Sequence, residues 1–282
     1  MFRRILTPIV LFLSAILTAE AQSLQEMVPI PDDNGARPQI LNGEPAERTD
    51  WPVTLRFQSG GGYCTSTIIG ERVVITAAHC VDNAAKAKVL FNNAWTEVTC
   101  FHHQRYKGPS CHTATTTEEI AGCTADVALC RASQPFKLVS DSGVAIRLES
   151  INRDPALLQV NATVMLLGYG CLEPGGPITD TLQIGKATIK SISVPGASSD
   201  PMKTMQEYMV AQGGAAVCQG DSGGSAFNQL AAGARKIIGL NSRGNISTLS
   251  YLTSTSDKHI LDFLESWGPT PICGVHSNAK GC

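Results

Sequence analysis

Beyond about residue 40, the sequence is broken into short apolar, β-branched runs separated by Gly, Asn, Asp and Pro. Runs of this length and spacing are typical of an all-β sandwich or barrel, because each is as long as a strand and ends on turn-forming residues. The clearest runs cover residues 67–70, 73–76, 88–91, 144–148, 164–168, 186–192 and 236–240. We find no internal repeat and no long low-complexity tract, so we expect one compact unit with room for two packed subdomains.

One late segment favours a helix instead. Large apolar side chains in residues 256–267 recur at helical spacing and fall on one face; they are Ile260, Leu261, Phe263, Leu264 and Trp267. Ser256 and Asp257 come just before them and are typical residues for a helix start. We therefore expect one amphipathic helix after the β-rich region.

A glycine-rich loop at residues 218–225, with the sequence CQGDSGGS, contains a candidate nucleophile. Ser222 lies in it directly after the carboxylate of Asp221. A serine hydroxyl reacts poorly unless a base takes its proton and nearby donors hold the developing oxyanion. Glycines allow such a loop to turn sharply, so that consecutive N–H groups can face one concavity. The loop therefore predicts a nucleophile only if the chain also supplies a base and an acid.

Candidates for both partners lie upstream. His79 follows the apolar run at 73–76, which predicts a buried strand, and Asp126 begins a second apolar run. An aspartate at the rim of a buried segment needs a partner, because an unpaired buried charge is costly, and a histidine N–H would supply one. The order His79, Asp126, Ser222 is the order found in the chymotrypsin class.

Three motifs in this order make the chain similar to the trypsin/chymotrypsin-type serine peptidase family: TAAHC at 76–80, DVAL at 126–129 and CQGDSGGS at 218–225. The resemblance covers nearly all of residues 40–267. It includes the pair Cys64 and Cys80, which in the family closes the histidine loop. The Gly-Tyr-Gly of 168–170 resembles the family's Gly-Trp-Gly turn.

The resemblance implies an all-β fold of two packed six-stranded antiparallel β-barrels with a C-terminal helix. The site would lie in the cleft between the barrels. His79 and Asp126 would come from the first barrel and Ser222 from the second, and the more polar stretch 131–154 would cross between them.

The resemblance also implies a serine-type endopeptidase that uses an acyl-enzyme intermediate. Ser222 would attack the peptide carbonyl, His79 would carry the proton and Asp126 would orient the histidine. Backbone N–H groups of Gly220 and Ser222 would form the oxyanion hole. A non-catalytic binding homologue is the competing function, and it is disfavoured because every triad position carries the required residue.

By the same resemblance, Asp221 would pair with a new N-terminal ammonium. Ile40 opens the segment Ile-Leu-Asn-Gly, similar to the family's Ile-Val-Gly-Gly start, and would be the mature N-terminus. Gln39 precedes it where most members carry Arg or Lys, so trypsin-like self-activation is not expected. Either another protease cuts after Gln39 or the mature end lies elsewhere. Gln39 and Asn42 also suggest a rival in which the chain is constitutively zymogen-like.

Alignment with the family backward from Ser222 places the base of the specificity pocket at Ala216, with Val217 beside it. A methyl group cannot pair a cationic side chain, so we expect small or apolar residues at the cleaved position rather than Arg or Lys. Gly244 would leave one pocket wall open, whereas Leu249 would narrow the other.

Ser242, Arg243 and Gly244 correspond to the family's substrate-binding segment. Arg243 stands where an aromatic residue is usual. It would either favour acidic substrate groups or be a solvated surface arginine, and we favour the second interpretation.

Ten cysteines favour disulfides in an oxidising compartment. The family's usual partner of Cys218 is missing, so Cys171 is our choice. Cys273 and Cys282 would close the tail on itself. The remaining cysteines, whose pairing stays open, would staple the insertion around Asp126; they are Cys100, Cys111, Cys123 and Cys130. His102, His103 and His112 fit no standard zinc spacing, so neither a metal nor a cofactor is expected.

The ends of the chain predict export. Residues 1–21 combine Arg3 and Arg4 with a short apolar run and small residues at a cleavage site, as in a signal peptide; twin-arginine export is the less favoured alternative. Residues 22–39 would be a propeptide, 40–267 the peptidase domain and 268–282 a cysteine-containing tail. We expect a secreted or periplasmic protein without a stable membrane anchor.

The net charge of −2 gives no reason to expect nucleic acid or an anionic membrane as a partner. We expect a monomer whose partners are protein or peptide substrates. An activating protease and protein inhibitors would be further partners.

Overall fold

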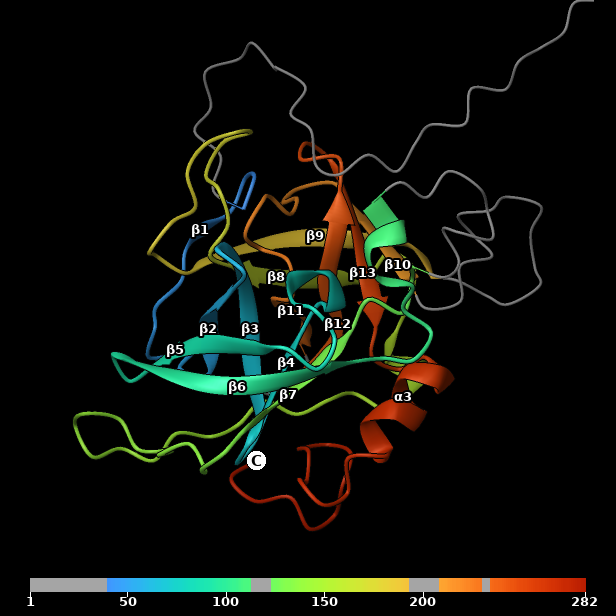
Figure 1. The fold of residues 1–282 in the computed structure, drawn as a ribbon. Helices are drawn as coiled ribbons and strands as arrows, with labels where there is room; N and C mark the ends of the chain where they lie inside the picture. Colours follow the sequence, from blue (N-terminus) through green and yellow to red (C-terminus); the bar gives the residue numbers. More distant parts are fainter. Residues whose placement is uncertain (1–39, 113–122, 193–207, 230–233) are drawn as a thin grey trace, which may run out of the picture.

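The computed structural model describes residues 40–112, 123–192, 208–229 and 234–282 (Figure 1). These residues form two closed six-stranded antiparallel barrels, followed by a C-terminal helix. The predicted chymotrypsin-like fold is therefore confirmed.

The first barrel has the closed strand order β2-β3-β4-β7-β6-β5, in which β5 pairs back onto β2. Its strands are β2 Thr54–Ser59, β3 Gly62–Gly70, β4 Val73–Thr76, β5 Lys86–Phe91, β6 Ala94–His102 and β7 Ala128–Ala132. Strand β5 illustrates the pattern, since its buried residues Ala87, Val89 and Phe91 alternate with more exposed ones. This alternation places one face of each strand in the core.

The second barrel has the order β9-β10-β13-β12-β11-β8 and is closed by pairing of β8 with β9. Its strands are β8 Thr163–Gly168, β9 Gln183–Ile192, β10 Tyr208–Gln212, β11 Ser225–Gln229, β12 Arg235–Gly244 and β13 Leu249–Ser254. A two-residue strand, β1 Glu44–Pro45, is added on the outside of β9. The chain crosses between the barrels after β7, through the polar stretch predicted to do so.

One predicted strand is wrong. Residues 144–148 form no strand; Val139 and Ala145 make only an isolated bridge. The hydrogen bond from the Ser140 N–H to the Val144 carbonyl closes a short turn instead, with Gly143 at φ +82°. Val144 is 64% exposed, so its apolar side chain has no core to enter. The crossing segment runs over the surface, where β-branched residues alone do not make a sheet.

The predicted helix is α3, Lys258–Glu265, which is shorter than the apolar pattern at 256–267. Asp257 caps it by accepting hydrogen bonds from the N–H groups of His259 and Ile260. Ile260 and Leu264 are fully buried and anchor the helix. The other helices within the described ranges are short 3-10 helices: η1 Ala78–Cys80, η2 Gly108–His112 and η3 Pro155–Leu157.

The tail beyond α3 is fastened to both the first barrel and the crossing segment. The Cys273 N–H donates to the Ile69 carbonyl at 2.7 Å, and the Ile151 N–H donates to the Cys273 carbonyl at 2.9 Å. A disulfide joins Cys273 to Cys282. The tail is thus part of the packed structure. No helix within the described residues is long and apolar enough to cross a membrane.

Candidate active site

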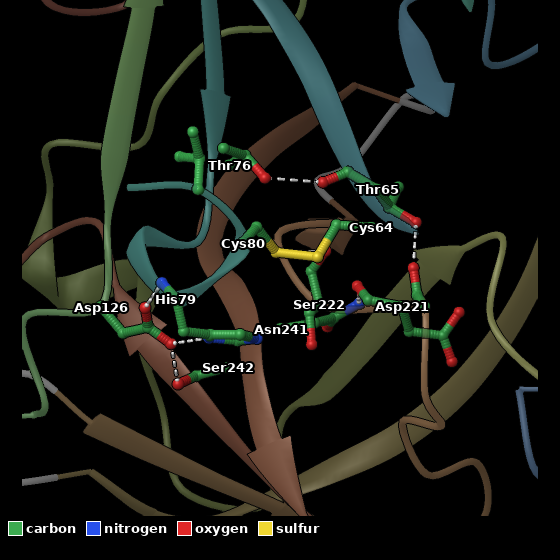
Figure 2. Close-up of a disulfide and its surroundings, with 12 residues drawn as sticks. Cys64, Thr65, Thr76, His79, Cys80, Asp126, Asp221, Ser222, Asn241 and Ser242 are labelled. Atoms are coloured by element: carbon green, nitrogen blue, oxygen red, sulfur yellow. Dashed lines mark hydrogen bonds and ion pairs between the residues drawn. A yellow bond between two sulfur atoms is a disulfide. The ribbon is translucent and has the colours of Figure 1, made fainter. Parts of the chain in front are cut away.

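Two adjacent strands of the first barrel bring a histidine and an aspartate together. His79 lies in η1 just after β4, Asp126 lies just before β7, and these strands pair with Thr76 opposite Ala128. The His79 Nδ1 atom lies 2.6 Å from Asp126 Oδ2, and the backbone N–H of His79 donates to Oδ1 at 2.9 Å (Figure 2). Asp126 therefore fixes both the ring and the backbone of His79.

Ser242 in β12 contacts the same carboxylate. Its Oγ donates to Asp126 Oδ2 at 2.6 Å and lies 3.0 Å from the Tyr208 hydroxyl. Sequence reasoning placed Ser242 only among substrate-binding residues and missed this contact. The two residues are 116 positions apart, so no local pattern could have indicated it.

The environment of Asp126 decides its charge. Burial alone would raise its pKa, but the charge and hydrogen bond of His79 lower it, as do the charge of Arg243 and the hydroxyl of Ser242. The net result is a pKa of about 2, so the carboxylate is ionised at neutral pH. An ionised carboxylate keeps the histidine Nδ1 protonated and leaves Nε2 free to accept a proton.

The loop that carries Ser222 is seated against the first barrel. The Thr65 N–H donates to the Ser222 carbonyl at 2.8 Å, and the Thr65 hydroxyl donates to the Gly220 carbonyl at 2.8 Å. Gly223 has φ +79°, and a Cβ there would lie 2.1 Å from the Thr76 hydroxyl oxygen, so only glycine fits. Ser222 thereby lies beside the Cys64–Cys80 disulfide that borders His79 (Figure 2). Sequence reasoning did not identify the role of Thr65.

The backbone of this loop leaves two donors unused. The N–H groups of Asp221, Gly223 and Gly224 donate to carbonyls of the protein. Within the described residues, the N–H groups of Gly220 and Ser222 have no protein acceptor. Gly220 has φ +94°, which lets its peptide turn in this way. Two free donors beside a serine hydroxyl can stabilise an oxyanion that forms there.

Behind the loop, Asp221 is fully buried. Its two carboxylate oxygens accept hydrogen bonds from the N–H groups of Gly170, at 2.7 Å, and Cys218, at 2.8 Å. Burial outweighs these bonds and raises its pKa to about 7. Ile40 is also fully buried, in the core of the second barrel. The next residue, Leu41, accepts a hydrogen bond from Ala216, two positions before Cys218.

The three predicted pocket residues lie close together. Ala216 and Val217 are almost completely buried. Gly244 packs against Val217: a Cβ at Gly244 would lie 3.2 Å from a Val217 methyl and 2.4 Å from the Leu249 carbonyl. Val217 and Gly244 therefore lie against each other, and none of the three side chains carries a polar group.

The interpretation of Arg243 as a solvated surface arginine is wrong. Its Nε is buried and has no hydrogen-bond partner among the described residues, although the residue as a whole is only half-buried. Burial alone would lower its pKa, but Tyr208, Asp126 and Tyr106 raise it. Arg243 is a cation held near the aspartate that contacts His79.

All cysteines of the described residues are paired. The disulfides are Cys64–Cys80, Cys100–Cys130, Cys111–Cys123, Cys171–Cys218 and Cys273–Cys282. Cys64, His79 and Cys80 form a compact group of potential metal ligands, but both thiols are consumed by the disulfide. The Nε2 atoms of His102 and His103 contact backbone carbonyls. The side chain of His112 lies outside the described residues.

Comparisons with known proteins agree with this geometry. Residues 40–254 match the family model described as Trypsin. The chain is similar to chymotrypsin-like elastase family member 1 of Homo sapiens, with 29% identity over 209 residues, covering 69% of this chain and 76% of the relative. The same protein of Canis lupus familiaris is 28% identical with the same coverage, and that of Rattus norvegicus is 28% identical over 66% and 72%. The chain belongs to the trypsin family and is a serine-type endopeptidase that acts on protein substrates.

Proposed function

We propose that this endopeptidase works through a triad of Ser222, His79 and Asp126. The observation that carries the proposal is the pair of hydrogen bonds from His79 to Asp126, formed next to the loop of Ser222. In the first step the Ser222 Oγ attacks the peptide carbonyl carbon while His79 Nε2 takes the hydroxyl proton. Asp126 stabilises the imidazolium that forms.

The oxyanion of the tetrahedral intermediate would accept hydrogen bonds from the N–H groups of Gly220 and Ser222. Each such donor typically contributes about 10²–10³ in rate. His79 then gives its proton to the leaving amine, and the C–N bond breaks to leave an acyl-enzyme. His79 next takes a proton from water as the water oxygen attacks the ester carbonyl carbon; it then gives that proton to Ser222 Oγ as the bond from Oγ to the acyl carbon breaks and the acid is released.

We propose a preference for small or apolar residues at the cleaved position. Ala216 and Val217 offer only methyl groups, and Gly244 is packed against Val217 and Leu249. None of these three residues is an anion that could pair Arg or Lys. The relatives carry the name elastase, and a small apolar preference fits that name.

Activation would involve a cut before Ile40, which creates an ammonium for Asp221. Ile40 has φ +27° in the uncut chain, a conformation that strains a β-branched residue. Cleavage removes the preceding peptide and with it this strain. The buried carboxylate of Asp221, whose pKa is raised when no cation faces it, would then gain a counter-ion.

The chain would be made with a signal peptide at 1–21 and a propeptide at 22–39, both outside the described residues, and exported to the periplasm or beyond the cell. Five disulfides within the described residues fit an oxidising compartment. The mature enzyme would comprise the peptidase domain at 40–267 and the tail at 268–282. It would be a monomer, released by an activating protease because Gln39 is a poor site for self-cleavage, and open to protein inhibitors.

A peptide library tests the proposal. Protein that begins at Ile40 should cleave after small apolar residues such as Ala and Val, and the Ser222→Ala variant should cleave none of the same peptides. Cleavage mainly after Arg or Lys would refute the proposed pocket. Equal cleavage by the Ser222→Ala variant would refute the triad.

A further inference from the structure

Two loops that meet behind the candidate oxyanion hole are joined by a disulfide. Cys171 follows β8, and Cys218 opens the loop that carries Gly220 and Ser222. The two cysteines are 47 positions apart, and both are fully buried. A buried disulfide is shielded from small thiols, which favours a structural role over a regulatory one.

The same two loops also make backbone contacts that reach Gly220. The Cys171 N–H donates to the Gln219 carbonyl at 2.7 Å, on the residue directly before Gly220. A Cβ at Gly220 would lie 2.8 Å from Ile178 Cγ2 and 3.0 Å from the Gly170 Cα. The turn from Cys171 to Ile178 therefore lies against the peptide of Gly220, and an isolated bridge between those two residues closes it.

The opposite side of Gly220 is held by the first barrel. The Thr65 hydroxyl donates to the Gly220 carbonyl at 2.8 Å and accepts from the Tyr169 N–H at 3.0 Å. Thr65 thus holds the peptide group that follows Gly220, and Cys171 holds the peptide group that precedes it and carries the Gly220 N–H. On the turn side, the covalent link of Cys171 to Cys218 keeps the two loops together.

We propose that Cys171 and Cys218 are positioning residues for catalysis, whose disulfide holds the Gly220 N–H in the orientation that an oxyanion needs. This role rests on the proposed triad and oxyanion hole. The disulfide would act on the transition state through Gly220, two positions after Cys218, and on substrate binding through Ala216 at the proposed pocket base, which lies in the same buried cluster as both cysteines. Loss of the disulfide should therefore lower kcat by a larger factor than it raises KM.

The test compares two double variants that both begin at Ile40. Cys171→Ala/Cys218→Ala removes the tether, and Cys273→Ala/Cys282→Ala removes a disulfide in the tail as a matched control. For each we would measure kcat and KM on a peptide amide, normalised to the sites that a fluorophosphonate labels. We would also measure the Ki of a peptidyl boronic acid, which mimics the tetrahedral intermediate.

Full loss of one oxyanion donor typically costs about 10²–10³ in rate, so a loosened donor should lower kcat by about tenfold or more. The Ki of the boronic acid should rise by a similar factor, while KM rises by a smaller factor than kcat falls and the control stays within about twofold of wild type. A tether variant with the kcat and Ki of the control would overturn the proposal. Equal losses of kcat and of boronic acid affinity in both double variants would also overturn the proposal, because removal of any disulfide would then have the same effect on catalysis.

A second variant covers the case in which the tether variant does not fold. Ile178→Ala keeps every disulfide but removes the side chain that packs on Gly220, and Ile178 is partly exposed. It should lower kcat by about threefold and weaken boronic acid binding in parallel; unchanged values would refute the positioning role. Wild-type protein that neither cleaves the peptide nor reacts with the fluorophosphonate would refute the triad itself. An active wild type whose disulfide variant or Ile178→Ala variant is unaffected would instead refute only the positioning role.

Discussion

The hydrogen bond from Ser242 to Asp126 gives a stability prediction whose size and pH dependence both follow from the structure. The Ser242 Oγ donates at 2.6 Å to a fully buried carboxylate. A hydrogen bond to a charged group contributes about 1.5–3 kcal/mol. Ser242→Ala should therefore lower the free energy of unfolding by about 2 kcal/mol at pH 7, roughly 30-fold in the folding equilibrium.

The loss should shrink in acid. The pKa of Asp126 is lowered to about 2 in the folded protein, so its stabilising effect is complete above the unfolded pKa of about 3.9 and disappears as the pH falls through the folded value. In the Ser242→Ala variant, folding lowers the pKa of Asp126 by a smaller amount. The difference in free energy of unfolding between wild type and variant should therefore fall by roughly half near pH 2.5.

The assay is urea unfolding at pH 7 and pH 2.5 in a Ser222→Ala background, which prevents self-digestion. Ser256→Ala is the matched control, since Ser256 is a buried serine whose hydroxyl bonds to neutral groups of Asn152. It should cost about 1 kcal/mol at both pH values. Equal losses for the two variants, or a Ser242→Ala loss that does not change with pH, would refute the assignment of a charged hydrogen bond. In active protein, Ser242→Ala should lower kcat/KM by less than the roughly 30-fold change in the folding equilibrium, because the hydrogen bond to Asp126 is present both before and during the reaction.

Three further predictions concern activity and activation. The value of kcat/KM should fall in acid, because a general-base histidine that already carries a proton cannot accept one from Ser222, and a profile that stays flat down to about pH 4 would contradict that role for His79. Ala216→Asp should move cleavage toward Arg and Lys in a peptide library, and an active variant with unchanged preference would place the pocket base elsewhere. Burial raises the pKa of Asp221 to about 7 in the uncut chain, so this group stabilises the fold below its unfolded pKa and that contribution is lost as the pH rises through about 7. The melting temperature of protein cut before Ile40 should therefore exceed that of the uncut chain by more at pH 8 than at pH 5; an equal gap would argue against an Ile40–Asp221 ion pair.

Much of the fold could be predicted from the sequence because local patterns carry it. Short β-branched and apolar runs in the sequence mark strands such as β5 and β9, and Asp257 marks the start of α3. The arrangement of the strands in two barrels was implied only by the family resemblance. The strand predicted at 144–148 was wrong because β-branched residues form a strand only where a neighbouring strand is available to pair with them.

The candidate site was predictable where its residues form motifs, as around His79 and Ser222. Thr65 and Ser242 lie in no motif, and their roles depend on contacts across 155 and 116 positions. The burial of the Arg243 Nε could not be predicted either, because the groups that interact with this side chain, among them Asp126 and Tyr106, lie far away in the sequence.

The central claim is that Ser222 is a nucleophile activated by His79. Protein that begins at Ile40 would be treated with a fluorophosphonate and the modified residue identified by mass spectrometry, alongside His79→Ala and Ser222→Ala variants. The account predicts that Ser222 of the wild type is labelled and that the label is lost in both variants. A wild type that is not labelled, or a His79→Ala variant labelled as fast as wild type, would contradict it.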